Sequence, residues 1–293
     1  MSSKILYGKP VADNIKRKLK LQIQELAEQN IIPSLSVILI GEDAASLVYV
    51  NTKHKTFLKF NCKSKIYSFN QEIKEEKIVN LIYNLNNDIS VHGILVQLPL
   101  PKHINYNNII NAISPEKDVD GLHPYNLGCL LSGKPNFIPC TPNGCLNLLK
   151  YYEIPVENKH IVIIGRSNIV GKPLMALLSQ KFEIGNATVT ICHTGTKNIK
   201  KHTMLADIII AAVGQPELIN SSMIKGGVHI IDVGVNRVKD NSSKAGYKLV
   251  GDIDFENVID KVKSITPVPG GVGPLTISML LYNTVFSAKN YLK

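Results

Sequence analysis

The feature that most constrains the fold is the alternation of strand-like and helix-like segments along the chain. Short apolar runs with the character of strands lie at 34–41, 63–69, 93–100, 160–165, 187–192, 207–214, 228–234 and 248–253. Segments with apolar residues at helical spacing lie at 10–30, 43–60, 72–87, 171–181 and 275–292. Strands that alternate with helices predict an α/β protein whose parallel sheets are covered on both faces.

A proline-rich stretch at 101–143 interrupts this alternation and divides the chain into two series of strands. Long segments without regular structure are usually functional loops or linkers, so we expect active-site loops and a domain crossing here. The segment between Cys140 and Cys145 is expected to be turn-like. We expect the final helix, after the glycine- and proline-rich loop at 266–274, to pack back on the first domain.

Composition excludes several classes of protein. The net charge is +10, but the 33 basic residues include only three arginines, and the lysines are spread rather than clustered, which argues against a nucleic-acid partner. No apolar run approaches the roughly 18 residues of a membrane span, so no membrane partner is expected. The five cysteines form no C-x-x-C pair, which predicts free thiols, no metal site and a reducing cytoplasm. The N-terminus has no secretory signal, which also favours a cytoplasmic location.

The segment at 161–173 has the order strand, tight turn, helix that binds nucleotide phosphates. Gly165 ends the strand and Gly171 allows close packing, but Ser167 stands where the usual second glycine would be. A purely structural turn is an equally good interpretation of this motif alone. Arg166 lies in the turn, and no acid follows the next strand, so NADP is predicted rather than NAD.

Polar residues that could carry chemistry lie in the first half. Ser46, Tyr49 and Lys53 share one face of a predicted helix, and a lysine in an apolar cleft can have a lowered pKa. Gln97 ends an apolar strand, where α/β sheets place ligand sites. Asp118 and Asp120 precede Gly121 in a predicted turn, and either could simply cap backbone groups.

Taken together, these residues resemble the methylenetetrahydrofolate dehydrogenase/cyclohydrolase family. The matching blocks occur in the family's order and span nearly the whole chain. They are SLVYVNTKHK (46–55), GILVQLPLP (93–101), PEKDVDGLHPYNLG (115–128), PCTPNG (139–144), GRSNIVGKP (165–173), CHTGT (192–196), DVGVNR (232–237) and TPVPGGVGPLT (266–276).

The resemblance implies two activities in one-carbon metabolism that feed purine biosynthesis. NADP-dependent oxidation of 5,10-methylenetetrahydrofolate to the methenyl form would be followed by hydrolysis to 10-formyltetrahydrofolate. It also implies a homodimer and two domains with a cleft between them. A small parallel α/β folate domain would comprise 1–141 plus 270–293, and a Rossmann-like NADP-binding domain would comprise 142–269.

The resemblance also implies roles for individual residues. Lys53 would be the catalytic lysine, Gln97 its partner, Tyr49 a stacking residue for the folate, and Asp120 the acid that holds the pterin. The cofactor would be bound by Gly165, Arg166, Ser167, Thr194 and Val235. The loop bordering the substrate would include Gly270, Gly271 and Pro274. Departures from the family pattern are small: Thr194 replaces a more common serine, Val235 an isoleucine, and Leu275 a methionine.

The sequence is compatible with three other functions. The closest alternative is a dehydrogenase without cyclohydrolase activity. The spacing of Tyr49 and Lys53 also occurs in short-chain dehydrogenases, but there the nucleotide turn precedes the pair, and here it follows. A non-catalytic NADP-binding regulator would have no need of Lys53, Gln97 and Asp120.

Overall fold

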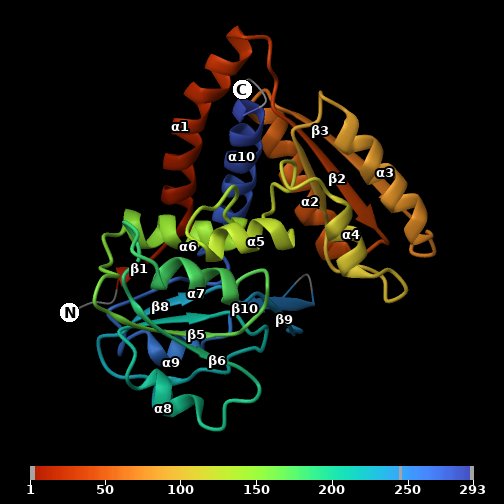
Figure 1. The fold of residues 1–293 in the computed structure, drawn as a ribbon. Helices are drawn as coiled ribbons and strands as arrows, with labels where there is room; N and C mark the ends of the chain where they lie inside the picture. Colours follow the sequence, from red (N-terminus) through yellow and green to blue (C-terminus); the bar gives the residue numbers. More distant parts are fainter. Residues whose placement is uncertain (1–3, 244–245, 291–293) are drawn as a thin grey trace. The chain divides into compact units, whose positions relative to one another are not determined.

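The computed structural model describes residues 4–243 and 246–290 (Figure 1). The chain separates into two compact units. Unit 1 contains the described residues up to Asp13 together with Thr141–Thr276. Unit 2 contains Asn14–Cys140 and the described residues from Ile277 onward. The two-domain α/β organisation expected from the alternation is therefore confirmed.

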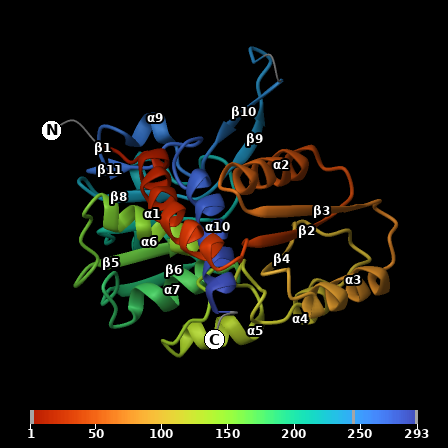
Figure 2. The same ribbon diagram turned by 90° about the horizontal axis from the view of Figure 1, so that it is seen from above.

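Unit 2 is built on a three-stranded parallel sheet in the order β3-β2-β4. Its strands are β2 (Ser34–Ile40), β3 (Lys63–Phe69) and β4 (Gly93–Val96). Helix α2 (Ala44–Lys59) covers one face, and α3 (Glu75–Asn87) and α4 (Tyr106–Ala112) cover the other (Figure 2). The face toward α3 and α4 is apolar because alternate strand residues, such as Ile38 and Ile40, point to the same side.

The proline-rich stretch carries more regular structure than the sequence predicted. It contains α4 and α5 (Pro124–Leu131), and its last residues begin α6 (Cys140–Tyr151). The expectation of a turn-like segment between Cys140 and Cys145 is therefore wrong. Pro142 lies in the first turn of α6, where a missing N–H group breaks no helical hydrogen bond.

The long helices α1 (Gly8–Glu28) and α10 (Gly273–Asn290) each begin in unit 1 and continue into unit 2. Within unit 2, Asn283 Nδ2 of α10 donates hydrogen bonds to the backbone oxygens of Val119 (2.8 Å) and Ile138 (3.0 Å). Ser287 Oγ donates to Glu116 O at 3.0 Å. The expected packing of the final helix on the first domain is confirmed.

Unit 1 contains a six-stranded parallel sheet in the order β1-β11-β8-β7-β5-β6. Its strands are β1 (Lys4–Ile5), β5 (His160–Ile164), β6 (Thr188–Cys192), β7 (Ile208–Ala211), β8 (His229–Asp232) and β11 (Ser264–Ile265). The faces are covered by α6 and α7 (Gly171–Ser179) on one side, and by α8 (Ile199–Thr203) and α9 (Phe255–Val258) on the other (Figure 1). A 3₁₀ turn, η1 (Ser221–Met223), follows β7.

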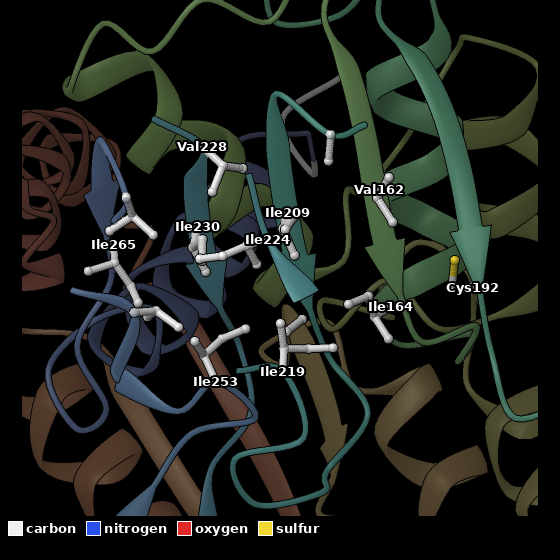
Figure 3. Packing of buried hydrophobic residues seen from close by; sticks show 14 residues of the cluster. Val162, Ile164, Cys192, Ile209, Ile219, Ile224, Val228, Ile230, Ile253 and Ile265 are labelled. Atoms are coloured by element: carbon white, nitrogen blue, oxygen red, sulfur yellow. The ribbon is translucent and has the colours of Figure 1, made fainter. Parts of the chain in front are cut away.

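The core of unit 1 explains why its strands are nearly continuous apolar runs. Side chains from five neighbouring strands form one buried cluster with residues of the connecting segments (Figure 3). Val162, Ile209 and Ile230 come from adjacent strands and are fully buried. Strands buried on both faces need apolar residues at every position, as in a doubly wound sheet.

The direction of chain progression reverses at β5, which pairs with β6 on one side and with β7 on the other. Ligands of open α/β sheets bind outside the carboxyl ends of the strands at such a switch point. The loops that leave this point are 165–170, after β5, and 212–215, after β7. The fold thus brings the predicted nucleotide turn to the expected edge of the sheet.

The prediction that 248–253 forms a strand of the parallel sheet is wrong. The segment at 248–253 contributes β10 (Tyr247–Val250), which forms an antiparallel hairpin with β9 (Asn236–Lys239). The parallel sheet instead ends with the two-residue strands β11 and β1, which are too short to give a periodic pattern. Because β1 pairs with β11, the described residues before Asn14 belong to unit 1, which differs from the predicted domain boundary. In the part of the chain that the structure describes, no helix is long and apolar enough to cross a membrane.

Candidate functional site

A buried lysine is the central feature of the site in unit 2. Helix α2 begins after Asp43, whose carboxylate accepts a hydrogen bond from Ser46 N at 2.8 Å. The helix then places Lys53 in a buried position, where the residue is only 7% exposed. Lys53 Nζ donates a hydrogen bond to Gln97 Oε1 at 2.9 Å. Two residues 44 positions apart in sequence therefore form one polar pair.

Gln97 is held in a single orientation by its own contacts. It follows β4 directly, and its backbone N–H donates to Ile38 O at 2.9 Å. Its side-chain Nε2 donates to Leu98 O at 2.7 Å. Because the amide nitrogen is engaged on one side, the amide oxygen faces the lysine on the other.

The surroundings of Lys53 favour its neutral form. Burial lowers the pKa of Lys53, and the nearby acidic groups of Asp120 and Cys140 oppose that shift more weakly. An amine whose pKa is lowered in this way exchanges protons more readily near neutral pH than an exposed lysine does. This is the behaviour that the sequence analysis predicted for a lysine in a low-dielectric cleft.

The two aspartates of the predicted turn have different surroundings. Asp118 is buried and accepts hydrogen bonds from His123 N and Asn126 Nδ2, both at 2.8 Å, and from Leu122 N at 3.1 Å. It holds the loop together, as a turn residue does. Asp120 is half-buried, and its charge acts on Lys53. The structure therefore places Asp120, and not Asp118, with the lysine.

Tyr49 lies one turn before Lys53 on α2. Its side chain is 39% exposed, and Lys53 Nζ lies 6.0 Å from the centre of its ring. Partial burial raises the pKa of the Tyr49 phenol, so the group stays neutral. An open aromatic face next to a cationic or polar cluster is suited to stacking on a flat heterocycle.

Sequence reasoning missed three residues near this cluster. Cys140 is fully buried, and burial together with the charge of Asp120 raises the pKa of its thiol. Tyr106 has a buried hydroxyl with no hydrogen-bond partner among the described residues, and no sequence pattern marks it. Asn283 ties α10 to the loop that carries Asp120. Its signal was present in the sequence, as an amide in the middle of an apolar helix.

The nucleotide turn in unit 1 has the close backbone contacts that a phosphate cradle needs. Gly165 has φ +122°, and a Cβ there would overlap Ala212 O of the neighbouring strand end. A Cβ at Gly171 would overlap Gly165 O. These two glycines let the chain turn sharply into α7. Lys172 N already donates to Ser167 O at 3.0 Å and Pro173 has no N–H, so a phosphate would be held by backbone N–H groups of the turn itself. The residues present therefore fit a dinucleotide.

The side chains around this turn are suited to a phosphorylated ribose. Arg166 and Thr194 are exposed, and Val235 is 51% exposed. Ser167 Oγ accepts a hydrogen bond from Val170 N at 3.1 Å, which shapes the turn. The segment after β6, Cys192–Lys197, contains no acid. An acid there would bind an unmodified ribose, whereas an arginine accommodates a 2′-phosphate.

The last predicted site residues, Gly270, Gly271 and Pro274, lie in unit 1, whereas the predicted boundary assigns 270–293 to the folate domain. Gly270 and Gly271 lie in the loop between β11 and α10. Gly270 has φ +106°, and its backbone oxygen accepts a hydrogen bond from Gly8 N at 2.9 Å. A Cβ at Gly271 would lie 2.6 Å from Pro267 O, so this position requires glycine. Pro274 lies in the first turn of α10, where proline is well tolerated.

Family models match both parts of the chain. The model of the tetrahydrofolate dehydrogenase/cyclohydrolase catalytic domain matches residues 6–120, and that of the NAD(P)-binding domain of the same family matches residues 139–292. The chain belongs to the tetrahydrofolate dehydrogenase/cyclohydrolase family. The family resemblance expected from the sequence blocks is thereby confirmed.

Relatives of this family align over nearly their full length. Bifunctional protein FolD of Chlamydia abortus is 52% identical over 96% of both chains. The solved FolD methylenetetrahydrofolate dehydrogenase/cyclohydrolase of Campylobacter jejuni is 49% identical, with a TM-score of 0.92 over 99% of both chains. The Trypanosoma brucei enzyme, solved with NADP and an inhibitor, is 35% identical, with a TM-score of 0.94 over 100% of this chain and 99% of its own.

Within this family member, the structure brings Tyr49, Lys53, Gln97 and Asp120 together in unit 2. The predicted cofactor residues lie on loops at the carboxyl edge of the unit 1 sheet. The predicted substrate residues Gly270, Gly271 and Pro274 also lie in unit 1, so the predicted folate residues come from both units.

Proposed function

We propose that this protein is a bifunctional enzyme that oxidises 5,10-methylenetetrahydrofolate to the methenyl form and hydrolyses that product to 10-formyltetrahydrofolate. The proposal agrees with membership of the tetrahydrofolate dehydrogenase/cyclohydrolase family. The observation that carries it is the buried Lys53–Gln97 pair beside Asp120. A dehydrogenase alone would not need a lysine with a lowered pKa.

The folate is proposed to bind in unit 2. Tyr49 offers an aromatic face to the flat ring system, and Asp120 accepts hydrogen bonds from the amino-pyrimidine edge of the pterin. In the oxidation, a cation develops on a carbon flanked by two nitrogens, so the step needs no strong acid or base. The protein's task is to hold the substrate in position.

The cofactor is proposed to be NADP, which supplies the hydride acceptor. Backbone N–H groups of the turn at 165–171 would hold its pyrophosphate, and Arg166, Ser167 and Thr194 would hold the 2′-phosphate. Gly165 and Gly171 keep the turn tight enough for this approach. Val235 would contribute a backbone contact.

The hydrolysis is the step that uses Lys53. A water must lose a proton as it adds to the methenyl carbon, and a ring nitrogen must gain a proton as its bond to that carbon breaks. A lysine with a lowered pKa can accept the proton that the water loses and donate a proton to the ring nitrogen. Gln97 keeps the amine aimed, because its oxygen accepts a hydrogen bond from Nζ.

We also propose that the protein is a homodimer in the cytoplasm and that its product feeds purine biosynthesis. The family resemblance supports the homodimer and the pathway. The five cysteines are free, and four of them are buried, which is typical of proteins from reducing compartments. Light scattering coupled to size-exclusion chromatography measures the mass in solution and tests the dimer.

A coupled assay tests the proposed function. The purified protein is supplied with 5,10-methylenetetrahydrofolate and NADP, and NADPH formation is followed beside methenyl absorbance. We expect NADPH to form without build-up of the methenyl compound, and methenyltetrahydrofolate supplied alone to decay faster than in buffer. The same assay with NAD tests the choice of cofactor.

Two results would contradict the proposal. Accumulation of the methenyl compound, with decay at the buffer rate, would leave a dehydrogenase only. Equal efficiency with NAD and NADP would overturn the role given to Arg166.

A further inference from the structure

Two buried acids in unit 1 lie outside the residues assigned so far. Asp232 ends β8, and Asp252 follows β10; they are 3% and 0% exposed. We infer that Asp232 and Asp252 are positioning residues that together fix the two loops beside the nucleotide turn in the shape that binds the cofactor. The inference rests on the proposed NADP site.

Asp252 binds the loop after β7. Its Oδ2 accepts hydrogen bonds from Val213 N (2.6 Å) and Gly214 N (3.1 Å), and its Oδ1 accepts from Gln215 N at 2.9 Å. Its Oδ1 also accepts from Nδ2 of Asn236, the first residue of β9, at 2.9 Å. A carboxylate is acceptor-only on both oxygens, so it satisfies four donors that a neutral side chain of the same size cannot.

Asp232 ties the loop after β8 to the segment that carries Asp252. Its Oδ1 accepts from Gly234 N (3.0 Å) and Asp252 N (3.1 Å), and its Oδ2 accepts from Ile253 N at 3.0 Å. Its own backbone N–H donates to Thr266 Oγ1 at 2.7 Å. Asp232 therefore places Asp252, and Asp252 places the loop after β7.

Two glycines make room for these carboxylates. A Cβ at Gly251 would overlap the carboxylate of Asp232, and a Cβ at Gly234 would overlap that of Asp252. Both glycines lie next to or close to the acids in sequence, in DVGVN (232–236) and GDI (251–253). At these two positions the backbone lies so close to a carboxylate that only glycine, which has no Cβ, fits.

The braced loops lie at the place where the cofactor is expected. Ala212, whose oxygen contacts Gly165, directly precedes the three residues that Asp252 holds. Val235 lies between Gly234, bound to Asp232, and Asn236, bound to Asp252. Hydrogen bonds to the two acids thus fix both sequence neighbours of Val235, the predicted cofactor contact, while Val235 itself is exposed.

Placing two acids together in a buried site has an electrostatic cost. Burial raises the pKa of Asp232 to about 7, and the charge of Asp252 adds to the shift. A pair of apolar residues would avoid that cost but would leave the loop N–H groups without acceptors. The arrangement therefore stabilises a particular loop shape more than it stabilises the fold.

Asp252→Asn tests the inference, with Asp254→Asn as the matched control. The amide nitrogen introduced at position 252 would face donors, so the loop after β7 loses acceptors. Asp254 contacts Asn257 and neither loop. NADPH binding is measured by calorimetry, hydrogen exchange is followed at residues 213–215, and methenyltetrahydrofolate hydrolysis is assayed without cofactor.

For Asp252→Asn we expect NADPH affinity to fall at least about tenfold, exchange at 213–215 to accelerate, and hydrolysis to stay within about twofold of the parent. Unchanged affinity and exchange would overturn the inference. Equal losses of affinity and hydrolysis would also overturn it, because they would indicate a general role in stability. Asp254→Asn should match the parent.

A milder variant decides the matter if Asp252→Asn does not fold. Asn236→Ala removes one donor from the Asp252 carboxylate at a half-buried position and leaves both acids in place. We expect a several-fold loss of NADPH affinity with hydrolysis retained, and an unaltered affinity would overturn the inference. A parent protein that binds no NADPH yet shows slow exchange at 213–215 would instead refute the proposed cofactor.

Discussion

Two buried charged groups, Lys53 in unit 2 and Asp252 in unit 1, have different kinds of hydrogen-bond partner. In unit 2, the amine of Lys53 contacts the side-chain amide of Gln97, which is itself held by the backbone. In unit 1, the carboxylate of Asp252 accepts hydrogen bonds from the backbone of three consecutive residues. A side-chain partner leaves the lysine able to change its protonation state. Backbone partners make the acid a fixed part of the loop. The first arrangement is suited to proton transfer and the second to holding a shape.

The largest effect is expected from removing the lysine of unit 2. Lys53→Met should lower methenyltetrahydrofolate hydrolysis at least about a hundredfold, the usual contribution of a positioned acid or base, while part of the dehydrogenase activity remains. Because the variant no longer buries an amine, its free energy of unfolding should not fall. Lys55→Met, at an exposed position on the same helix, is the control and should leave both activities intact. Hydrolysis at the parent rate would remove Lys53 from the mechanism.

A second test targets the rigid acids of unit 1 through the space around them. Gly251→Ala places a Cβ against the Asp232 carboxylate, which three N–H groups prevent from moving. Overpacking of this kind should lower the free energy of unfolding by about 1–3 kcal/mol, measured by urea denaturation. At Gly226 a new Cβ meets no atom within 4 Å, so Gly226→Ala should change little. Equal stabilities of the two variants would show that the pocket around Asp232 is loose.

A third test uses pH. The pKa of Asp232 is raised from 3.8 to about 7 in the folded protein. The folded state therefore binds a proton more tightly than the unfolded state, and this contribution to stability is present at low pH and lost as pH rises from about 4 to about 7. Relative to Asp232→Asn, the parent should lose on the order of 4 kcal/mol across this window. Parallel stability curves for the two proteins would contradict the raised pKa.

The smallest effect concerns an exposed charge. Arg166→Ala should raise the KM for NADP about tenfold, as expected for one charge-assisted contact, and leave the KM for NAD nearly unchanged. Arg17→Ala removes another exposed arginine, one that contacts Asn14, and serves as the control. If the preference for NADP survives Arg166→Ala, another group must read the 2′-phosphate.

The sequence predicted those parts of the fold that depend on repeated local patterns. The strand at 63–69 and the helix that carries Lys53 appear as expected, because apolar periodicity extends over several turns or pleats. The sequence-based prediction failed where pairing between distant strands decides the structure. Leu249 pairs with Arg237 in a hairpin instead of extending the parallel sheet, and nothing in the local pattern distinguishes these outcomes. The two-residue strands β1 and β11 have no pattern of their own.

The candidate site was predictable to a similar extent. Motif blocks identified Lys53, Gln97 and Arg166, and their catalytic and binding roles stay predictions. Local pattern alone does not separate Asp118 from Asp120, because both lie in one turn, and it is the family resemblance that selects Asp120. The contacts of Asp118 with His123 and Asn126 give that residue a structural role. The sequence did not indicate Asp232 and Asp252, whose function depends on backbone groups that any residue supplies.

The threading of the chain through its two units has a consequence for handling the protein in pieces. The division falls within α1, at the start of α6 and within α10, so neither unit is encoded by one uninterrupted stretch. A gene fragment covering 141–276 would lack β1 and leave β11 as an unprotected strand edge. A fragment ending at 140 would lack the helix that carries Asn283. Cutting the chain at any of these boundaries therefore separates elements that belong to the same unit.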